Sequence, residues 1–204
     1  MIVTKIEPCA KTKYKVFLEG EFAFVLYKGE LSRFHIREGE DLSESLVRQI
    51  HDEVLLKRAK LRAMHLLEDM DRTEEALREK LRQGMYPPDI VDRAVEYVRS
   101  FGYLNDERYA ENFVRSRQGT KSRKEILAAL LKKGVPRELI DCAIEACYKE
   151  RGEEDAIRKI LKKKRFDPGD ADENETRRIY AYMARKGFRY DDVRQVIQNY
   201  EVDA

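Results

Sequence analysis

Basic side chains are the residues of this chain whose type and spacing could do chemistry. They gather in the second half of the sequence, close to predicted helix ends. The set consists of Arg115, Arg117, Lys121, Arg123, Lys124, Lys132, Lys133, Lys162, Lys163, Lys164 and Arg165. Clustered guanidinium and ammonium groups suit phosphate or carboxylate partners. These residues are therefore candidates for binding an acidic protein surface or a nucleic-acid backbone.

Helix electrostatics explain part of this set without any partner. Charge runs on helices are usually solvated faces, and the helix dipole favours Lys or Arg near a helix C-terminus. This explanation accounts for Lys132 and Lys133 as well as a binding role does. Arg123 and Lys124 differ, because they enter a predicted helix N-terminus, where the dipole disfavours positive charge. Their position favours a binding role.

Residue patterns typical of catalysis do not occur in this sequence. His35, His51 and His65 do not have metal-ligand spacing, and neither a nucleotide-binding glycine loop nor a nucleophile motif occurs. Cys9, Cys142 and Cys147 are too few and too scattered for a disulfide framework or a zinc site. We expect a protein that is not an enzyme and that needs no cofactor or metal.

The composition is typical of amphipathic helices with charged outer faces. Of 204 residues 39% are charged and 42% hydrophobic, the mean hydropathy is -0.69, and the net charge is only +2. Any basic surface must therefore come from local segregation of charge. No apolar run approaches the ~20 residues of a membrane span, and no signal peptide is visible. We expect a cytoplasmic protein without membrane contact.

Residues 1–42 differ from the rest and predict a small β module. Residues 14–18 and 22–27 are rich in aromatic and β-branched residues, and a short link containing Gly20 suits a hairpin. Residues 2–6 alternate and predict a third strand that Pro8 ends. Because a small sheet is marginal alone, it must pack on another part of the chain.

The remainder predicts a mainly α chain of tandem three-helix repeats in an elongated, curved array. Helical periodicity starts at Ser43, and Gly84 and Gly134 lie 50 residues apart, as do Gly102 and Gly152. Gly187 anchors a third copy, and apolar residues recur at fixed distances from these glycines. The predicted repeats are residues 43–102, 103–152 and 153–204, an arrangement in which each unit chiefly contacts its neighbours.

The glycine register makes further predictions about single residues. Gly84, Gly134 and Gly187 each end the second helix of a repeat, and Gly152 ends the last helix of the second repeat. Cys147 falls in the same column as Tyr97 and Tyr200, which predicts a buried core thiol. The alternative, one all-α domain whose glycines coincide, explains the aligned apolar columns less well.

The segment from Gly102 to Arg117 connects the first two repeats and closely resembles a family signature. It reads Gly-Tyr-Leu-Asn-Asp-Glu-Arg-Tyr-Ala, followed by Phe-Val-Arg-Ser-Arg over 113–117. The RecX regulatory proteins of bacteria carry Gly-Tyr-Leu-Asp-Asp followed by a helix that ends in Arg-x-Arg. In this chain Asn105 stands in place of the first Asp, and Asn caps a helix equally well. Residues 126–135 and 76–81 look like two further RecX segments, so the resemblance covers about residues 59–200.

The resemblance implies a monomeric, non-enzymatic modulator of the RecA recombinase. RecX proteins bind in the groove of the RecA filament on single-stranded DNA and mostly inhibit filament extension, ATP hydrolysis and strand exchange. It thereby implies a role in homologous recombination, DNA repair and the SOS response, with weak direct DNA binding as a further option. The resemblance does not divide the basic residues between RecA and DNA, and it leaves the β module without a role.

Two other functions remain open. A stand-alone DNA-binding protein of helix-turn-helix type would also use three-helix units, although the nearly neutral net charge argues against it. A helical adaptor for some other partner is the second alternative. Phe101 and Tyr103 beside Gly102 are interpreted as packing residues.

Overall fold

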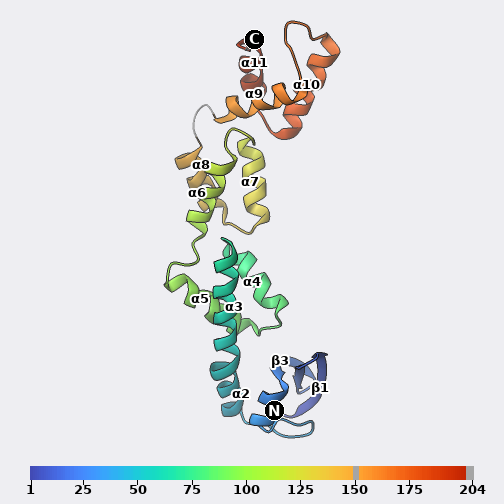
Figure 1. Cartoon of the computed structure of the whole chain (residues 1–204), viewed down its shortest axis with the longest axis vertical. Coiled ribbons are helices and arrows are strands. Elements are labelled where there is room, and N and C mark those ends of the chain that lie inside the picture. Colours follow the sequence, from blue (N-terminus) through green and yellow to red (C-terminus); the bar gives the residue numbers. More distant parts are fainter. Residues whose placement is uncertain (149–151, 201–204) are drawn as a thin grey trace. The chain divides into compact units, whose positions relative to one another are not determined.

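The computed structural model describes residues 1–148 and 152–200 and divides the chain into two compact units. The first unit is Met1–Asn105 and the second is Asp106–Ala204 (Figure 1). The first holds a three-stranded sheet and a three-helix repeat, and the second holds two further three-helix repeats. The predicted fold class, mainly helical with tandem three-helix repeats and a small N-terminal sheet, is confirmed.

The sheet is an antiparallel meander of β1 (Val3–Ala10), β2 (Lys13–Leu18) and β3 (Glu21–Tyr27) in that order. Glu19 and Gly20 join β2 to β3 with φ values of 50° and 87°, as a tight turn with two positive φ angles requires. The prediction that Pro8 ends the first strand is wrong. β1 lies at the edge of the sheet and shifts register after Pro8, and both features accommodate a residue without an N–H donor.

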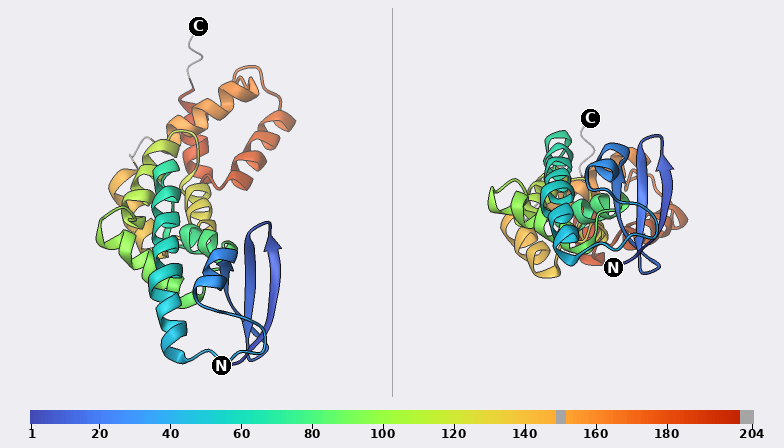
Figure 2. Two further views of the ribbon diagram at one scale, coloured as in Figure 1. Left: turned by 60° about the horizontal axis from the view of Figure 1, so that its bottom comes forward. Right: turned by 90° about the horizontal axis from the view of Figure 1, so that it is seen from below.

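The helices of the first unit share one hydrophobic core with the sheet. Helix α1 (Lys28–Arg33) follows β3, and α2 (Glu44–Ile50) continues through one π-helical turn, η1 (His51–Leu55), into α3 (Leu56–Asp69). Helices α4 (Glu74–Gln83) and α5 (Pro88–Ser100) complete the repeat. In both views of Figure 2, α1 lies between the strands and α3. The sheet therefore gains from the helical repeat the burial that it lacks alone.

The second unit contains two cores, one for each repeat. Helices α6 (Asp106–Arg117), α7 (Arg123–Lys132) and α8 (Arg137–Cys147) surround one core. Helices α9 (Gly152–Lys164), α10 (Glu173–Lys186) and α11 (Tyr190–Gln198) surround the other. The prediction that Gly152 ends a helix is wrong: α8 ends at Cys147, and Gly152 is the first residue of α9.

The register of the first repeat is one residue away from the predicted one. Met85, Gly134 and Gly187 have φ values of 60°, 79° and 86°, whereas Gly84, with a φ of -74°, is not left-handed. Counted from these three residues, the positions eight and four before and six and nine after are buried in every repeat. They are Leu77, Ile126 and Ile179; Leu81, Leu130 and Met183; Val91, Ile140 and Val193; and Ala94, Ala143 and Val196.

The corrected register also changes the column of Cys147. This thiol is buried, as predicted, but its counterpart in the first repeat is the buried Val98 and not Tyr97. The predicted register of the first repeat was wrong by one residue because Gly84 lies directly before Met85, the residue that has the positive φ. The physical constraint is the left-handed residue that closes the second helix of each repeat, and in the first repeat this residue is not glycine.

Met85→Gly is expected to stabilise the first unit. A left-handed conformation costs a non-glycine residue about 1–2 kcal/mol, and the loss of a half-buried methionine side chain offsets part of the gain. We expect the free energy of unfolding to rise by about 0.5–1 kcal/mol, measured by urea denaturation. Gly84→Ala is the neighbouring control: its Cβ would lie 3.0 Å from the Tyr86 ring, so it should not stabilise. A lower unfolding midpoint for Met85→Gly would contradict the corrected register.

Candidate protein and nucleic-acid interface

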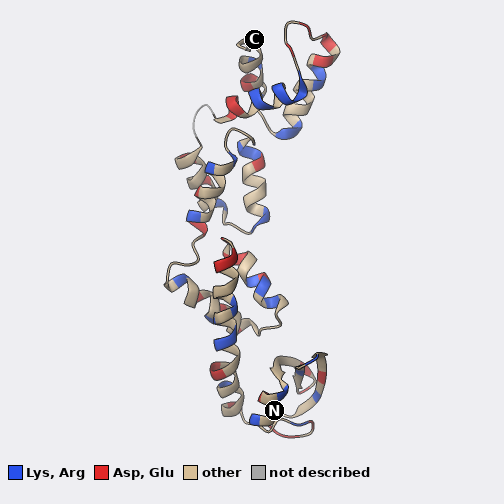
Figure 3. Cartoon of the chain, viewed as in Figure 1, with Lys and Arg blue, Asp and Glu red and all other residues tan. Residues whose placement is uncertain are grey.

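The predicted basic residues occupy different surroundings in the second unit. Arg117 and Lys133 share an aromatic surface on α6, and Lys121, Arg123 and Lys124 lie where the second repeat meets the third. The run from Lys162 to Arg165 ends α9. Figure 3 shows how these positive charges are distributed along the helices.

Two aromatic rings on α6 lie beside two basic groups, one from the end of α6 and one from the end of α7. Tyr109 and Phe113 stack with centroids 6.4 Å apart, since residues four apart lie on the same face of a helix. The Arg117 guanidinium lies 5.8 Å from the Phe113 centroid, and Lys133 Nζ lies 5.8 Å and 6.0 Å from the Tyr109 and Phe113 centroids. We call these four residues the basic–aromatic surface. It combines charge for an anion with flat apolar area.

Arg115 belongs to a different face of α6. Two residues along a helix correspond to a rotation of about 200°, so Arg115 and Arg117 point in nearly opposite directions. Arg115 pairs with Glu111 at 3.0 Å on its own helix. The Arg-x-Arg ending of α6 therefore does not act as one double-charged group.

Ser122 and Glu125 hold the second repeat to the third. Ser122 is fully buried, and its Oγ donates to the Lys186 carbonyl oxygen at 2.6 Å while accepting from the Glu125 N–H at 3.1 Å. The Glu125 carboxylate accepts from Lys186 Nζ at 2.9 Å and pairs with Lys121 at 3.4 Å. Ser122 and Glu125 form the predicted capping box of α7. We call this set of contacts, with Lys121 and Lys186, the inter-repeat joint.

Arg123 and Lys124 pack against the joint. The Arg123 guanidinium lies 4.8 Å from the Tyr148 centroid, and its backbone N–H donates to Glu153 at 3.2 Å. Tyr148 is buried and its hydroxyl donates to the Lys121 carbonyl at 2.9 Å. Burial, and to a lesser degree the Glu153 carboxylate, raises the pKa of the Tyr148 phenol well above its usual value, so the hydroxyl remains a donor. An acidic neighbour and an aromatic ring thus offset the unfavourable dipole at Arg123.

The hollow beside the joint is electrically balanced. It has a volume of about 420 Å³, and Gly187 lies in its wall. Its charged lining residues are Arg123, Lys124, Arg189, Glu153, Glu154 and Asp192. Three cations facing three carboxylates do not select an anion. The prediction that Arg123 and Lys124 bind a partner stays a prediction, and the geometry gives both a packing role.

Glu125→Gln is expected to weaken the inter-repeat joint in a pH-dependent way. Burial alone would raise the pKa of the Glu125 carboxyl, but the Lys186 hydrogen bond and the Lys121 charge lower it below its usual 4.5. The stabilisation is therefore present above the unfolded-state pKa and is lost as the pH falls through the lowered folded-state pKa. Glutamine keeps the capping box but not the charge.

We expect Glu125→Gln to cost about 0.5–1 kcal/mol at neutral pH. The difference from the unaltered chain should persist to about pH 5 and shrink toward about pH 3. Urea unfolding of both proteins across this range measures it. A difference that has already vanished by about pH 6 would contradict the assigned ion pairs.

The lysine run at the end of α9 has an electrostatic explanation of its own. Lys162, Lys163 and Lys164 form the last turn of α9, whose first turn holds Glu153, Glu154 and Asp155 (Figure 3). Acids at the start and bases at the end complement the helix dipole. Lys164 Nζ also lies 4.5 Å from the Tyr182 centroid, and exposed Arg165 follows with a φ of 54°. These four residues remain binding candidates on an exposed helix end.

Sequence reasoning missed an exposed aromatic row in the first unit. Phe101 and Tyr103, interpreted as packing residues, are 58% and 57% exposed, so that interpretation is wrong. Their rings stack with centroids 6.1 Å apart, Tyr97 contacts Phe101 at 5.0 Å, and Lys60 Nζ lies 4.2 Å from the Tyr97 centroid. The sequence signal that could have predicted this row is the presence of three aromatic residues close to Gly102. Exposed rings of this size are typical of binding surfaces.

Within residues 1–148 and 152–200 no group of three or more His, Cys, Asp or Glu side chains is arranged to hold a metal ion. No helix in that part of the chain has the length and apolar character needed to cross a membrane.

Three family models match the chain in tandem. They are the first, second and third three-helix domains of RecX, over residues 59–97, 105–144 and 152–197, and together they cover more than half of the sequence. The "Regulatory protein RecX" of Caldanaerobacter subterraneus subsp. tengcongensis is 30% identical over 97% of this chain and 98% of its own length. That of Trichlorobacter lovleyi is 34% identical over 68% of this chain and 92% of its own.

Solved structures agree with these matches. A crystal structure of regulatory protein RecX superposes with a TM-score of 0.67 and 24% identity, covering 98% of this chain and 99% of that one. RecX from Lactobacillus salivarius superposes with a TM-score of 0.63 and 25% identity, covering 71% of this chain and 96% of that one. The resemblance seen in the sequence is confirmed, and this chain belongs to the RecX family of regulatory proteins.

Proposed function

We propose that this chain regulates the RecA recombinase by binding the RecA filament on single-stranded DNA. It mostly inhibits filament extension, ATP hydrolysis and strand exchange, and so acts in homologous recombination, DNA repair and the SOS response. The observation that carries this proposal is the tandem match of three RecX domains, together with relatives named regulatory proteins over nearly the whole chain. The protein acts as a cytoplasmic monomer and catalyses no reaction.

Within the second unit, the basic–aromatic surface is the part proposed to contact the filament. Arg117 and Lys133 present positive charge beside the Tyr109 and Phe113 rings, so the surface can bind a carboxylate or phosphate and also bury apolar area. The lysine run from Lys162 to Lys164 and Arg165 extends the candidate set to the third repeat. Arg123 and Lys124 contribute by fixing the geometry between the two repeats.

Co-sedimentation with RecA filaments tests the proposal. The chain should sediment with RecA assembled on single-stranded DNA with a non-hydrolysable ATP analogue, and not with either component alone at physiological salt. No co-sedimentation under any of these conditions would overturn the proposed function. A stand-alone helix-turn-helix protein would instead bind duplex DNA without RecA, with an affinity that falls steeply with salt.

A further inference from the structure

The two faces of the N-terminal sheet differ. One face is apolar and buried, and the other carries lysine and aromatic side chains. Val16 and Leu18 of β2 and Phe24 and Leu26 of β3 point into the core of the first unit and are nearly fully buried. Because side chains alternate along a strand, Lys13, Lys15 and Phe17 of β2 point to the opposite side. Strand pairing places Lys5 of β1 and Phe22 of β3 beside Phe17 on that side. We call Lys5, Lys13, Lys15, Phe17 and Phe22 the outer sheet face.

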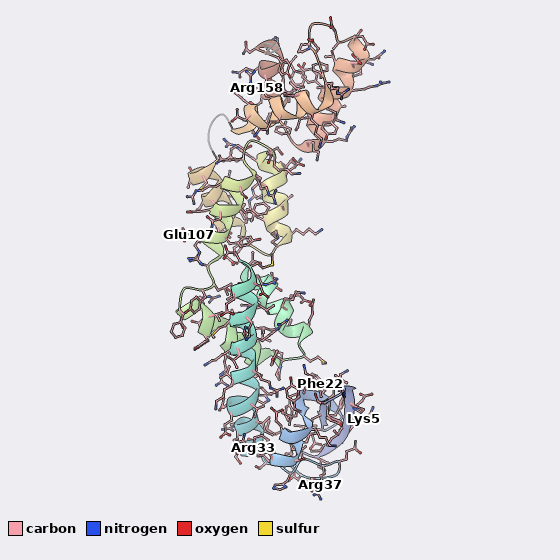
Figure 4. All side chains as sticks on the ribbon, viewed as in Figure 1. Lys5, Phe22, Arg33, Arg37, Glu107 and Arg158 are labelled. Carbon is pink, nitrogen blue, oxygen red and sulfur yellow. The ribbon has the colours of Figure 1, made fainter. Side chains whose placement is uncertain are left out.

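The two aromatic rings of the outer sheet face are accessible and supported by a neighbouring strand. Phe22 is 42% exposed, and its ring contacts Phe17 edge to face with centroids 6.0 Å apart. Lys5 Nζ lies 5.8 Å from the Phe17 centroid. Figure 4 shows Lys5 and Phe22 at the periphery of the β module. Phe22 lies at the start of the edge strand β3, and with Phe17 of β2 it forms an aromatic pair on the surface. Adjoining exposed rings, rather than a single exposed ring, are typical of a binding surface.

The charge on this face is predominantly positive. Three lysines, Lys5, Lys13 and Lys15, lie on this face together with one acid, Glu7, which pairs with Lys5 at 3.5 Å. Lys13 Nζ also lies 5.5 Å from the centroid of Tyr27, the last residue of β3. Lysines that flank aromatic rings on an antiparallel sheet match a flexible polyanion whose flat groups can stack. Single-stranded nucleic acid has this chemistry: phosphates for the lysines and bases for the rings.

We propose that the outer sheet face is a binding site for single-stranded nucleic acid. A protein partner is a poorer match, because lysines lie directly beside the Phe17–Phe22 pair and the core of a protein interface is depleted of charged residues. The site is outside the three segments matched by RecX domains and does not include the basic–aromatic surface. It is independent of the proposed RecA contact, and its test contains no RecA.

Fluorescence anisotropy of the full chain with labelled oligo(dT) and oligo(U) tests the site. Phe22→Ala should weaken binding of the preferred oligonucleotide about tenfold, since each base stacked on an aromatic side chain contributes substantially. Tyr190→Ala, which removes a 63% exposed ring from α11, is the matched control and should bind as the unaltered chain does. Lys13→Gln with Lys15→Gln should make the slope of log affinity against log salt about 1.4 shallower.

Photo-cross-linking locates the contact independently of any substitution. Trypsin releases residues 16–28 as one peptide that contains Phe17, Phe22 and Tyr27. A bromouracil-substituted oligonucleotide should cross-link to this peptide. The inference is overturned if Phe22→Ala folds and binds within about twofold of the unaltered chain, if Tyr190→Ala weakens binding equally, or if the cross-links map only outside residues 16–28. Co-sedimentation with RecA can succeed or fail in each of these cases, so the two proposals fail separately.

Discussion

Reversing both charges of the basic–aromatic surface, in the double variant Arg117→Glu and Lys133→Glu, is expected to relieve inhibition of RecA ATP hydrolysis at least about tenfold. Both groups lie over the Tyr109–Phe113 pair, so the substitution turns the charge of the whole surface from positive to negative. Like charges opposed across an interface cost several kcal/mol, and about 1.4 kcal/mol corresponds to tenfold in affinity. The measurement is the protein concentration that gives half-maximal inhibition.

Arg115→Glu is the matched control for this variant. Arg115 lies on the same helix two residues from Arg117, but it faces the other way and pairs with Glu111. Its reversal should change inhibition less than about threefold. Equal effects of Arg115→Glu and of the double variant would contradict the assignment of the surface, although not the family.

Gly187→Ala is expected to destabilise the second unit by about 2–5 kcal/mol. Gly187 closes α10 with a φ of 86°, and a left-handed alanine costs about 1–2 kcal/mol. An added Cβ would also lie 2.8 Å from Lys124 Cβ, which is too close and forces α7 and α10 apart at a further cost of about 1–3 kcal/mol. Urea unfolding measures the loss, and hydrogen exchange should localise it to α10 and the inter-repeat joint.

Gly102→Ala separates the two contributions. Gly102 also has a positive φ, of 71°, but an added Cβ there would meet nothing within 4 Å. It should cost only the conformational part, about 1–2 kcal/mol. If both alanine variants lose the same stability, the close approach of Lys124 to Gly187 does not hold the second and third repeats together.

The fold was largely predictable from local chemistry. Alternating aromatic and β-branched residues mark the strands, Ser122 with Glu125 marks the start of α7, and apolar periodicity marks the repeats. The wrong predictions assumed that glycine always ends a helix and that proline always ends a strand. Gly84 is not left-handed and Met85 is, Gly152 starts a helix, and Pro8 lies within an edge strand. In each case tertiary context decided the backbone conformation.

The candidate site was less predictable than the fold, because surface roles depend on what lies across from each charge. Helix spacing alone predicts that Arg115 and Arg117 lie on different faces of α6. It does not predict that Lys133, which follows α7, lies near the same Phe113 ring as Arg117. The dipole argument identified Arg123 as unusual, and its neighbours Tyr148 and Glu153 come from segments far along the chain. The exposure of Phe101 and Tyr103 likewise depends on which faces the repeats bury.

RecA ATP hydrolysis on single-stranded DNA, titrated with this protein at two salt concentrations, tests the central claim most directly. The account predicts that hydrolysis falls as the protein is added, and that higher salt raises the concentration needed, because charged groups carry part of the contact. Hydrolysis that stays constant at both salt concentrations, with protein in excess over RecA, would contradict it.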